Sequence, residues 1–251
     1  MHKKRPLKGQ LLFMNMASLL KVPLILSSAI MLQISLTPPH VPPSKEIIHQ
    51  TFNEWVFTRT IKYGFPVLKA IYWAVSLAEI ATIASHAIDS LSVIQAITQY
   101  AVGHRILDTP ITFPFILGTA LAITGGVIRW WCYRTLGRFF TFQLSVRQGH
   151  SIVTTGPYAV IRHPSYTAAF IHLTGMLILH GSPTSWLRRS GILDVPGLKL
   201  VVVAWLAQMS VVMINIVCRI SQEDEALKSA FRDEWERWAK VVRYRLVPGV
   251  Y

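Results

Sequence analysis

The chain has 251 residues, of which 52% are hydrophobic and only 15% are charged, and its formal net charge at pH 7 is +13. An ordinary soluble domain has about 25% charged residues, so this composition argues against that class and favours a membrane protein. The Lys and Arg residues cluster at the ends of apolar runs and form no basic face interleaved with aromatic residues. The charge therefore indicates lipid headgroup contact and no nucleic-acid partner.

Five apolar stretches approach the ~20 residues that a helix needs to cross a bilayer. They cover residues 11–36, 65–88, 113–133, 167–180 and 198–218. Pro23 interrupts the first stretch, which is either a kinked span or a tight helical pair. The fourth is long enough only if its helix begins near Pro164, which places His163 at the helix start. The predicted fold is all-α: a polytopic integral membrane protein with about five transmembrane helices.

The connections between these stretches bear on topology. TPPHVPPSKE at residues 37–46 predicts an extended connector, because proline cannot sustain a helix there. The arginines nearest to the membrane cluster around one loop, residues 134–163, which the positive-inside rule places in the cytosol. They are Arg129, Arg134, Arg138, Arg147 and Arg162. Counting back from this loop through two single spans puts the basic N-terminus in the lumen, which contradicts the same rule. Either residues 11–36 form a hairpin or residues 90–103 re-enter the membrane.

Few ionisable groups lie inside the apolar stretches. Glu79 is costly in a bilayer, so we expect it to pack against another polar group of a span. The histidines at 86, 172 and 180 show no paired metal-ligand spacing, and the two cysteines, Cys132 and Cys218, show none either. The sequence therefore predicts no metal.

Beyond the last apolar stretch the chain becomes abruptly charged. Leu227, Phe231, Trp235 and Trp238 recur at steps of three and four residues. This spacing is typical of one face of an amphipathic helix, which we expect to lie on the headgroups at the cytosolic side.

Arg219 and Glu223 stand apart from these charges, because they lie four residues apart on the first turns beyond the apolar stretch. A guanidinium binds a carboxylate through two hydrogen bonds, whereas a Glu favours a cation or a hydroxyl-bearing ligand. Either the two residues face one partly dry cavity, or they pair with each other, which is worth under ~1 kcal/mol at an exposed site. The residues alone leave both interpretations open.

Several motifs follow one another in the second half of the chain: Gln143, HSIV at 150–153, GPY at 156–158, RHPSY at 162–166 and RISQEDEAL at 219–227. Together they resemble the isoprenylcysteine carboxyl methyltransferase family. Their order and spacing match as well as the residues. The resemblance covers about residues 129–251, and the N-terminal spans with their Pro-rich connector look similar to fungal members. We therefore expect one membrane domain over residues 1–251, with N-terminal spans in 1–110 and a catalytic core in 111–251.

The resemblance implies an enzyme of CaaX processing in the endoplasmic reticulum membrane, with its active site facing the cytosol. It implies methyl transfer from S-adenosyl-L-methionine to the C-terminal carboxylate of a farnesylated or geranylgeranylated cysteine. It also implies that Arg219 holds the substrate and forms the catalytic pair with Glu223. The implied cofactor contacts are Gln143, His150, Ser151, Ile152, Val153, Tyr158, His163, Pro164, Ser165, Tyr166 and Glu223.

The chain departs from the family pattern at two places. The usual Glu-Glu pair is Glu223-Asp224 here, and the Phe-Gly expected before the terminal helix is Phe231-Arg232. The loop at 181–197 is also longer than usual. Three other functions compete: a phospholipid N-methyltransferase, which shares the cofactor region, a membrane sterol reductase, which has a similar C-terminal ending, and a scaffold without catalysis.

Overall fold

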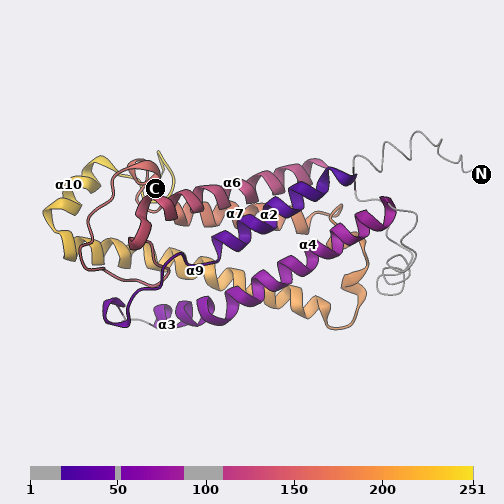
Figure 1. The fold of residues 1–251 in the computed structure, drawn as a ribbon. Helices are drawn as coiled ribbons and strands as arrows, with labels where there is room; N and C mark the ends of the chain where they lie inside the picture. Colours follow the sequence, from indigo (N-terminus) through magenta and orange to yellow (C-terminus); the bar gives the residue numbers. More distant parts are fainter. Residues whose placement is uncertain (1–17, 49–51, 88–109, 251) are drawn as a thin grey trace, which may run out of the picture.

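The computed structural model describes residues 18–48, 52–87 and 110–250, and these residues form helices and no β-strand. Only an isolated bridge between Ile47 and Ser145 has strand-like pairing in them. The all-α prediction is confirmed. The main helices are α2 (Lys21–Ser35), α3 (Phe52–Arg59), α4 (Phe65–Ala87), α6 (Phe113–Leu136), α7 (Pro164–Gly181), α8 (Trp186–Arg189), α9 (Leu198–Phe231) and α10 (Asp233–Val241). In Figure 1 the long helices form an elongated bundle, and α10 and the C-terminus lie at one end of it.

Three helical segments of the described chain are long and apolar enough to cross a membrane, namely Phe52–Ala84, Phe113–Phe139 and Leu198–Phe231. The count of about five spans is therefore not confirmed. Helix α2 has 15 residues, which corresponds to about 22 Å and falls short of a hydrocarbon core of about 30 Å. Helix α7 has 18 residues and packs against α6 along its length. The chain is a multi-pass membrane protein.

Two expectations about the N-terminal half can be compared with the structure. Helix α2 begins at Lys21, so Pro23 lies in its first turn, where the missing N–H removes no helical bond. The Pro-rich connector is irregular until a short 3-10 turn, η1, at Ser44–Glu46, as predicted. Residues 11–17 and 90–103 lie outside the described residues, so the hairpin and the re-entrant stretch stay predictions.

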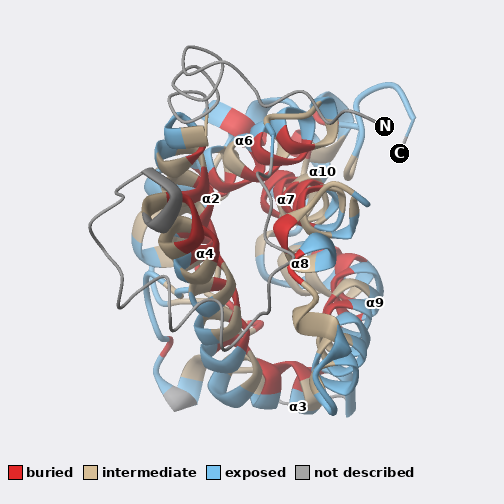
Figure 2. Cartoon of the chain, turned by 90° about the vertical axis from the view of Figure 1, so that its right-hand side faces the viewer, coloured by how far each residue is buried: buried red, intermediate tan, exposed pale blue. Residues whose placement is uncertain are grey.

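Small residues bring α6 and α7 into close contact. A Cβ atom added at Gly125 would lie 2.5 Å from the backbone nitrogen of His172, and one added at Gly118 would lie 2.6 Å from that of Leu179. Such close approach of backbones is typical of small residues at helix interfaces in membranes. Figure 2 shows the buried residues on the facing sides of α2, α4, α6 and α7, whereas α9 is largely exposed. This exposed face suits contact with lipid.

A buried ion pair joins α2 to α4. The Lys21 ammonium lies 2.6 Å from the Glu79 carboxylate, and the two side chains are 2% and 7% exposed. Since an unpaired charge in a bilayer is costly, each residue compensates the other. The prediction that Glu79 packs against another polar group is confirmed.

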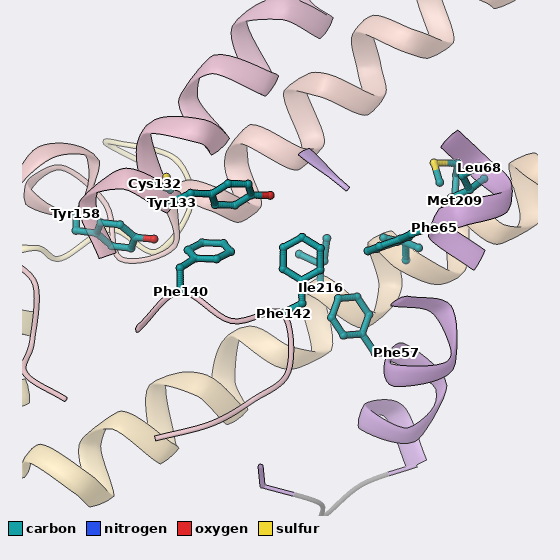
Figure 3. Packing of buried hydrophobic residues seen from close by; sticks show 11 residues of the cluster. Phe57, Phe65, Leu68, Cys132, Tyr133, Phe140, Phe142, Tyr158, Met209 and Ile216 are labelled. Atoms are coloured by element: carbon teal, nitrogen blue, oxygen red, sulfur yellow. The ribbon is translucent and has the colours of Figure 1, made fainter. Parts of the chain in front are cut away.

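An aromatic cluster fills the bundle beside the connection from α6 to α7 (Figure 3). Phe140, Phe142 and Leu144 alternate as buried residues of this connection. Phe142 packs edge-on against Phe65 of α4, and Phe65 packs edge-on against Phe57 of α3. The aromatic contacts thus fix the connection, which holds many of the predicted site residues, against α3 and α4.

The charged C-terminal segment differs from the prediction of one amphipathic helix. Helix α9 ends at Phe231, Arg232 has a φ of 45°, and α10 begins at Asp233. Trp238 is 8% exposed and packs inward. The apolar face of α10 therefore covers the protein at this residue, where we expected contact with headgroups.

Candidate active site

The motif RHPSY begins α7, with Pro164 as its first residue and His163 as its N-cap. The predicted helix start is confirmed. The backbone N–H groups of Arg162 and His163 donate to the carbonyls of Tyr244 and Arg245, both at 2.9 Å. The C-terminal tail thus holds the start of α7 in place.

Asp224 connects three segments of this end of the bundle. Its carboxylate lies 2.9 Å from Nη1 of Arg162, 3.1 Å from Nε2 of His163 and 3.1 Å from Nε of Arg245. The residue is 5% exposed, so these contacts satisfy a carboxylate that has left water. The Asp at the second position of the acidic pair has a structural role, which the sequence left open.

Glu223 points differently from its neighbour. Tyr166 donates its hydroxyl to Oε2 of Glu223 at 2.5 Å, and Nδ1 of His163 lies 3.8 Å from the same oxygen. The rings of His163 and Tyr166 stack with their centroids 5.4 Å apart. The Glu223 side chain is 32% exposed, which leaves carboxylate capacity for a ligand.

Arg219 does not pair with Glu223. Its Nε lies 3.3 Å from Oε1 of Glu54 on α3, and its Nη1 donates a hydrogen bond to the carbonyl of Phe142. The residue is 5% exposed. Of the two interpretations that the sequence left open, the structure has the shared cavity, because Arg219 and Glu223 line the same pocket.

This pocket gathers most of the predicted site residues. It is lined by Arg219, Gln143, His150, Ile152, Val153, Tyr158, His163, Ser165, Tyr166 and Glu223. Ser151 is exposed and Pro164 is buried as the first residue of α7, and neither lines it. The cavity volume is about 100 Å³. Ligand pockets are typically ~300 to 1,000 Å³, so a nucleoside-sized ligand requires this pocket to open further.

Within the described residues, four buried polar atoms of pocket residues have no hydrogen-bond partner: Nε of Arg162, Nε of Arg219, Nδ1 of His150 and Nε1 of Trp238. The two arginines form ion pairs with carboxylates, so the nitrogens of His150 and Trp238 are the two that can bind a ligand. Since buried polar groups are normally satisfied, both atoms fit a polar ligand. The His150 ring stacks on Phe139 at 4.6 Å and meets the edge of Phe231 at 5.3 Å, which holds it in place.

Burial sets the protonation of two groups here. It lowers the pKa of His150 below its usual 6.5, and the nearby Glu223 only partly opposes this. It raises the pKa of Tyr158 well above 10. Both side chains are therefore neutral near pH 7, and His150 offers a neutral imidazole to a ligand.

The family match concerns the segment that contains most of α6, the connection and α7. Residues 117–190 match the isoprenylcysteine carboxyl methyltransferase (ICMT) family. Over this segment the resemblance seen in the sequence is confirmed. A curated relative, protein-S-isoprenylcysteine O-methyltransferase B of Arabidopsis thaliana, is 34% identical over 70 residues, which are 27% of this chain and 36% of the relative. The chain thus matches about a third of that relative's length, and no solved structure matches.

The ICMT-matched segment contains the motifs from Gln143 to Tyr166 and ends before Arg219 and Glu223. The structure places these last two beside it in the same pocket. The described residues contain no group of three or more His, Cys, Asp or Glu residues arranged to hold a metal ion. A fungal origin stays a prediction.

Arg129, which the positive-inside count placed among the arginines nearest to the membrane, is instead buried inside the bundle. The residue is 7% exposed, and its Nη1 donates to the carbonyl and the hydroxyl of Ser165 at 3.1 and 2.9 Å. Its Nε donates to the carbonyl of Ser35 and to the hydroxyl of Tyr133. Arg129 therefore ties α2 and α6 to the start of α7. Its place inside an apolar run was the signal for such a role.

Proposed function

We propose that the chain methylates the C-terminal carboxylate of prenylated cysteine, using S-adenosyl-L-methionine. The observation that supports this most is the pairing of charges in one pocket: the buried guanidinium of Arg219 and the partly exposed carboxylate of Glu223 both line it. A pocket with both charges suits one anionic and one cationic reactant. The ICMT-matched segment lines the rest.

The residues of the pocket fit the cofactor. Glu223 would accept hydrogen bonds from its hydroxyl or amino groups, and the unpartnered nitrogens of His150 and Trp238 would bind its polar atoms. When bound, S-adenosyl-L-methionine supplies the methyl group that a carboxylate oxygen takes up in a single displacement, and S-adenosylhomocysteine leaves.

Arg219 orients the carboxylate of the acceptor. A C-terminal carboxyl has an unperturbed pKa of ~3.5 and is ionised at neutral pH, so no residue has to act as a base. The contribution of the protein is orientation in a pocket with little water, and orientation lowers barriers by up to ~7 to 11 kcal/mol. The catalytic roles therefore go to Arg219, which positions the nucleophile, and Glu223, which positions the donor.

The lipid part of the acceptor explains why the site lies at the end of apolar helices. A prenyl chain gains ~0.8 kcal/mol for each CH2 that it buries, so it favours a path through the bilayer. The exposed apolar face of α9 continues to the turns that contain Arg219. We infer a location in the endoplasmic reticulum membrane with the pocket facing the cytosol, where prenylated proteins and the cofactor are both accessible.

The direct test is transfer of radiolabelled methyl from S-adenosyl-L-methionine to N-acetyl-S-farnesylcysteine by the purified protein in detergent. The carboxamide of the same compound is the matched control. The proposal expects a base-labile methyl ester from the acid and no labelling of the amide. Labelling of phosphatidylethanolamine with neither compound labelled would contradict it and favour a phospholipid N-methyltransferase.

A further inference from the structure

The partner of Arg219 comes from a part of the chain that lies outside the motifs and outside the ICMT-matched segment. Glu54 lies on α3, and its Oε1 is 3.3 Å from Nε of Arg219. The side chains of Arg219 and Glu54 are only 6% and 8% exposed. A charge pair this deeply buried is costly unless its geometry is specific, so the contact calls for a role.

The nitrogen atoms that make these contacts show which end of the Arg219 guanidinium faces away from Glu54. A guanidinium has five N–H donors, one on Nε and two on each Nη. Glu54 lies on the Nε side of Arg219 at ion-pair distance, without a hydrogen bond to Nε, and the Phe142 carbonyl accepts from Nη1. Among the described residues, both hydrogens of Nη2 and one of Nη1 have no other contact on the side away from Glu54. These hydrogens form the end of the guanidinium that binds a carboxylate with two prongs.

Helix α3 contacts Arg219 through an aromatic ring as well as through the Glu54 carboxylate. Phe57, one turn after Glu54, has its ring 5.1 Å from the guanidinium. Phe57 in turn packs against Phe65 at 6.4 Å, within the aromatic cluster seen in Figure 3. These contacts fix helix α3 to the core, so Glu54 and Phe57 restrict the position of the Arg219 guanidinium.

We propose that Glu54 is a positioning residue, which fixes Arg219 by its Nε side so that its Nη end meets the carboxylate of the acceptor. This inference rests on the proposed function, in which Arg219 binds that carboxylate. A rigidly held guanidinium loses little freedom when the acceptor binds, and a loose one loses more. Glu54 does not line the pocket, so it would act on acceptor affinity through Arg219.

The test compares Glu54→Gln with the wild type and with Glu236→Gln. Glu236 also forms an ion pair, with Lys228 at 3.1 Å, but its side chain is 48% exposed and lies outside the pocket. Glu54→Gln keeps the shape and removes the charge. We expect its KM for N-acetyl-S-farnesylcysteine to rise about tenfold, because the neutral amide no longer compensates and holds the buried guanidinium. The Kd for S-adenosylhomocysteine and the Ki of the carboxamide analogue should stay within about twofold, and Glu236→Gln should match the wild type.

The acid and its carboxamide separate positioning from mere stability. A structural defect would weaken the binding of the acid and of the carboxamide alike, and this result would overturn the inference. An unchanged KM for the acid would also overturn it. A lowered KM would show that Glu54 competes with the acceptor, and it too would overturn the proposal. If Glu54→Gln shows no cooperative unfolding transition, Glu54→Asp replaces it, and the same KM rise with unchanged cofactor binding is expected. An inactive wild type would contradict the proposed function itself, whereas an active wild type with normal Glu54→Gln kinetics contradicts only this inference.

Discussion

Tyr166 donates its hydroxyl to Glu223 across 2.5 Å, and this contact links the start of α7 to the C-terminal part of α9. The two residues come from the ICMT-matched segment and from the motif beyond it. The hydrogen bond fixes one oxygen of Glu223 and leaves the other for a ligand. Through it, the two motifs line one pocket.

Tyr166→Phe should therefore weaken cofactor binding without removing the acceptor site. The variant loses one hydrogen bond to a carboxylate, worth about 1 kcal/mol or more, so the Kd of S-adenosylhomocysteine should rise at least about fivefold. Isothermal titration in detergent measures this. Tyr63→Phe is the matched control, because Tyr63 is 53% exposed. If Tyr166→Phe and Tyr63→Phe bound S-adenosylhomocysteine equally well, the hydrogen bond from Tyr166 to Glu223 would have no role in cofactor binding.

Asp224→Asn should destabilise the protein more than it changes chemistry. The substitution removes the negative charge that Arg162, Arg245 and the His163 ring contact, and breaking a buried pair costs about 3 kcal/mol. We expect a Tm lower by several degrees in a thermal unfolding scan. Glu225→Gln, next to it and exposed, should leave the Tm unchanged. A normal Tm for Asp224→Asn would show that the three contacts are not coupled to folding.

Arg232→Gly should stabilise the turn between α9 and α10. Among the described residues, Arg232 is the one residue other than glycine with a positive φ, which is 45° with a ψ of −113°. A left-handed residue with a side chain costs about 1 kcal/mol, which glycine avoids. The Tm should rise by a few degrees, whereas Arg237→Gly inside α10 should lower it, since glycine disfavours a helix. A lower Tm for Arg232→Gly would mean that the Arg232 side chain itself stabilises the turn.

The pH profile follows from an acceptor that is already ionised. Between pH of about 6.5 and 8.5 the carboxylate and the neutral His150 do not change their protonation, so kcat/KM for the acid should be flat. An amine acceptor would give a rate that rises with pH over this range. A rising profile with the acid would contradict a mechanism without a base.

The lowered pKa of His150 also predicts how the stability of the protein depends on pH. Its folded pKa is lowered, so below pH of about 6.5 the unfolded chain binds a proton that the folded pocket resists. The contribution of His150 is complete above that pH and is lost as the pH falls toward the folded pKa. The drop in Tm between pH 7.5 and 5.5 should therefore be smaller in His150→Gln than in the wild type. An equal drop would place the effect in other groups.

What the sequence predicted well depends on local chemistry. Pro164 can start a helix because the first turn needs no N–H from it, so the position of His163 followed from the motif itself. Glu79 required a partner for an equally local reason, the cost of a charge among apolar residues.

What the sequence could not show depends on contacts between distant segments. No motif marks Glu54, and only folding brings α3 to Arg219. Counting arginines near the membrane placed Arg129 at headgroups, because the count does not reveal that polar groups of α2, α6 and α7 converge on it. The helix break at Arg232 was hidden because Phe231 and Trp235 keep a helical spacing across it.

The kinetics of Arg219→Lys decide whether Arg219 holds the acceptor carboxylate, as proposed. Lysine keeps the charge and loses the planar fork. We predict that the KM for N-acetyl-S-farnesylcysteine rises by about tenfold or more, while the Kd of S-adenosylhomocysteine stays within about twofold of the wild type. A variant with an unchanged KM for the acid would contradict the account.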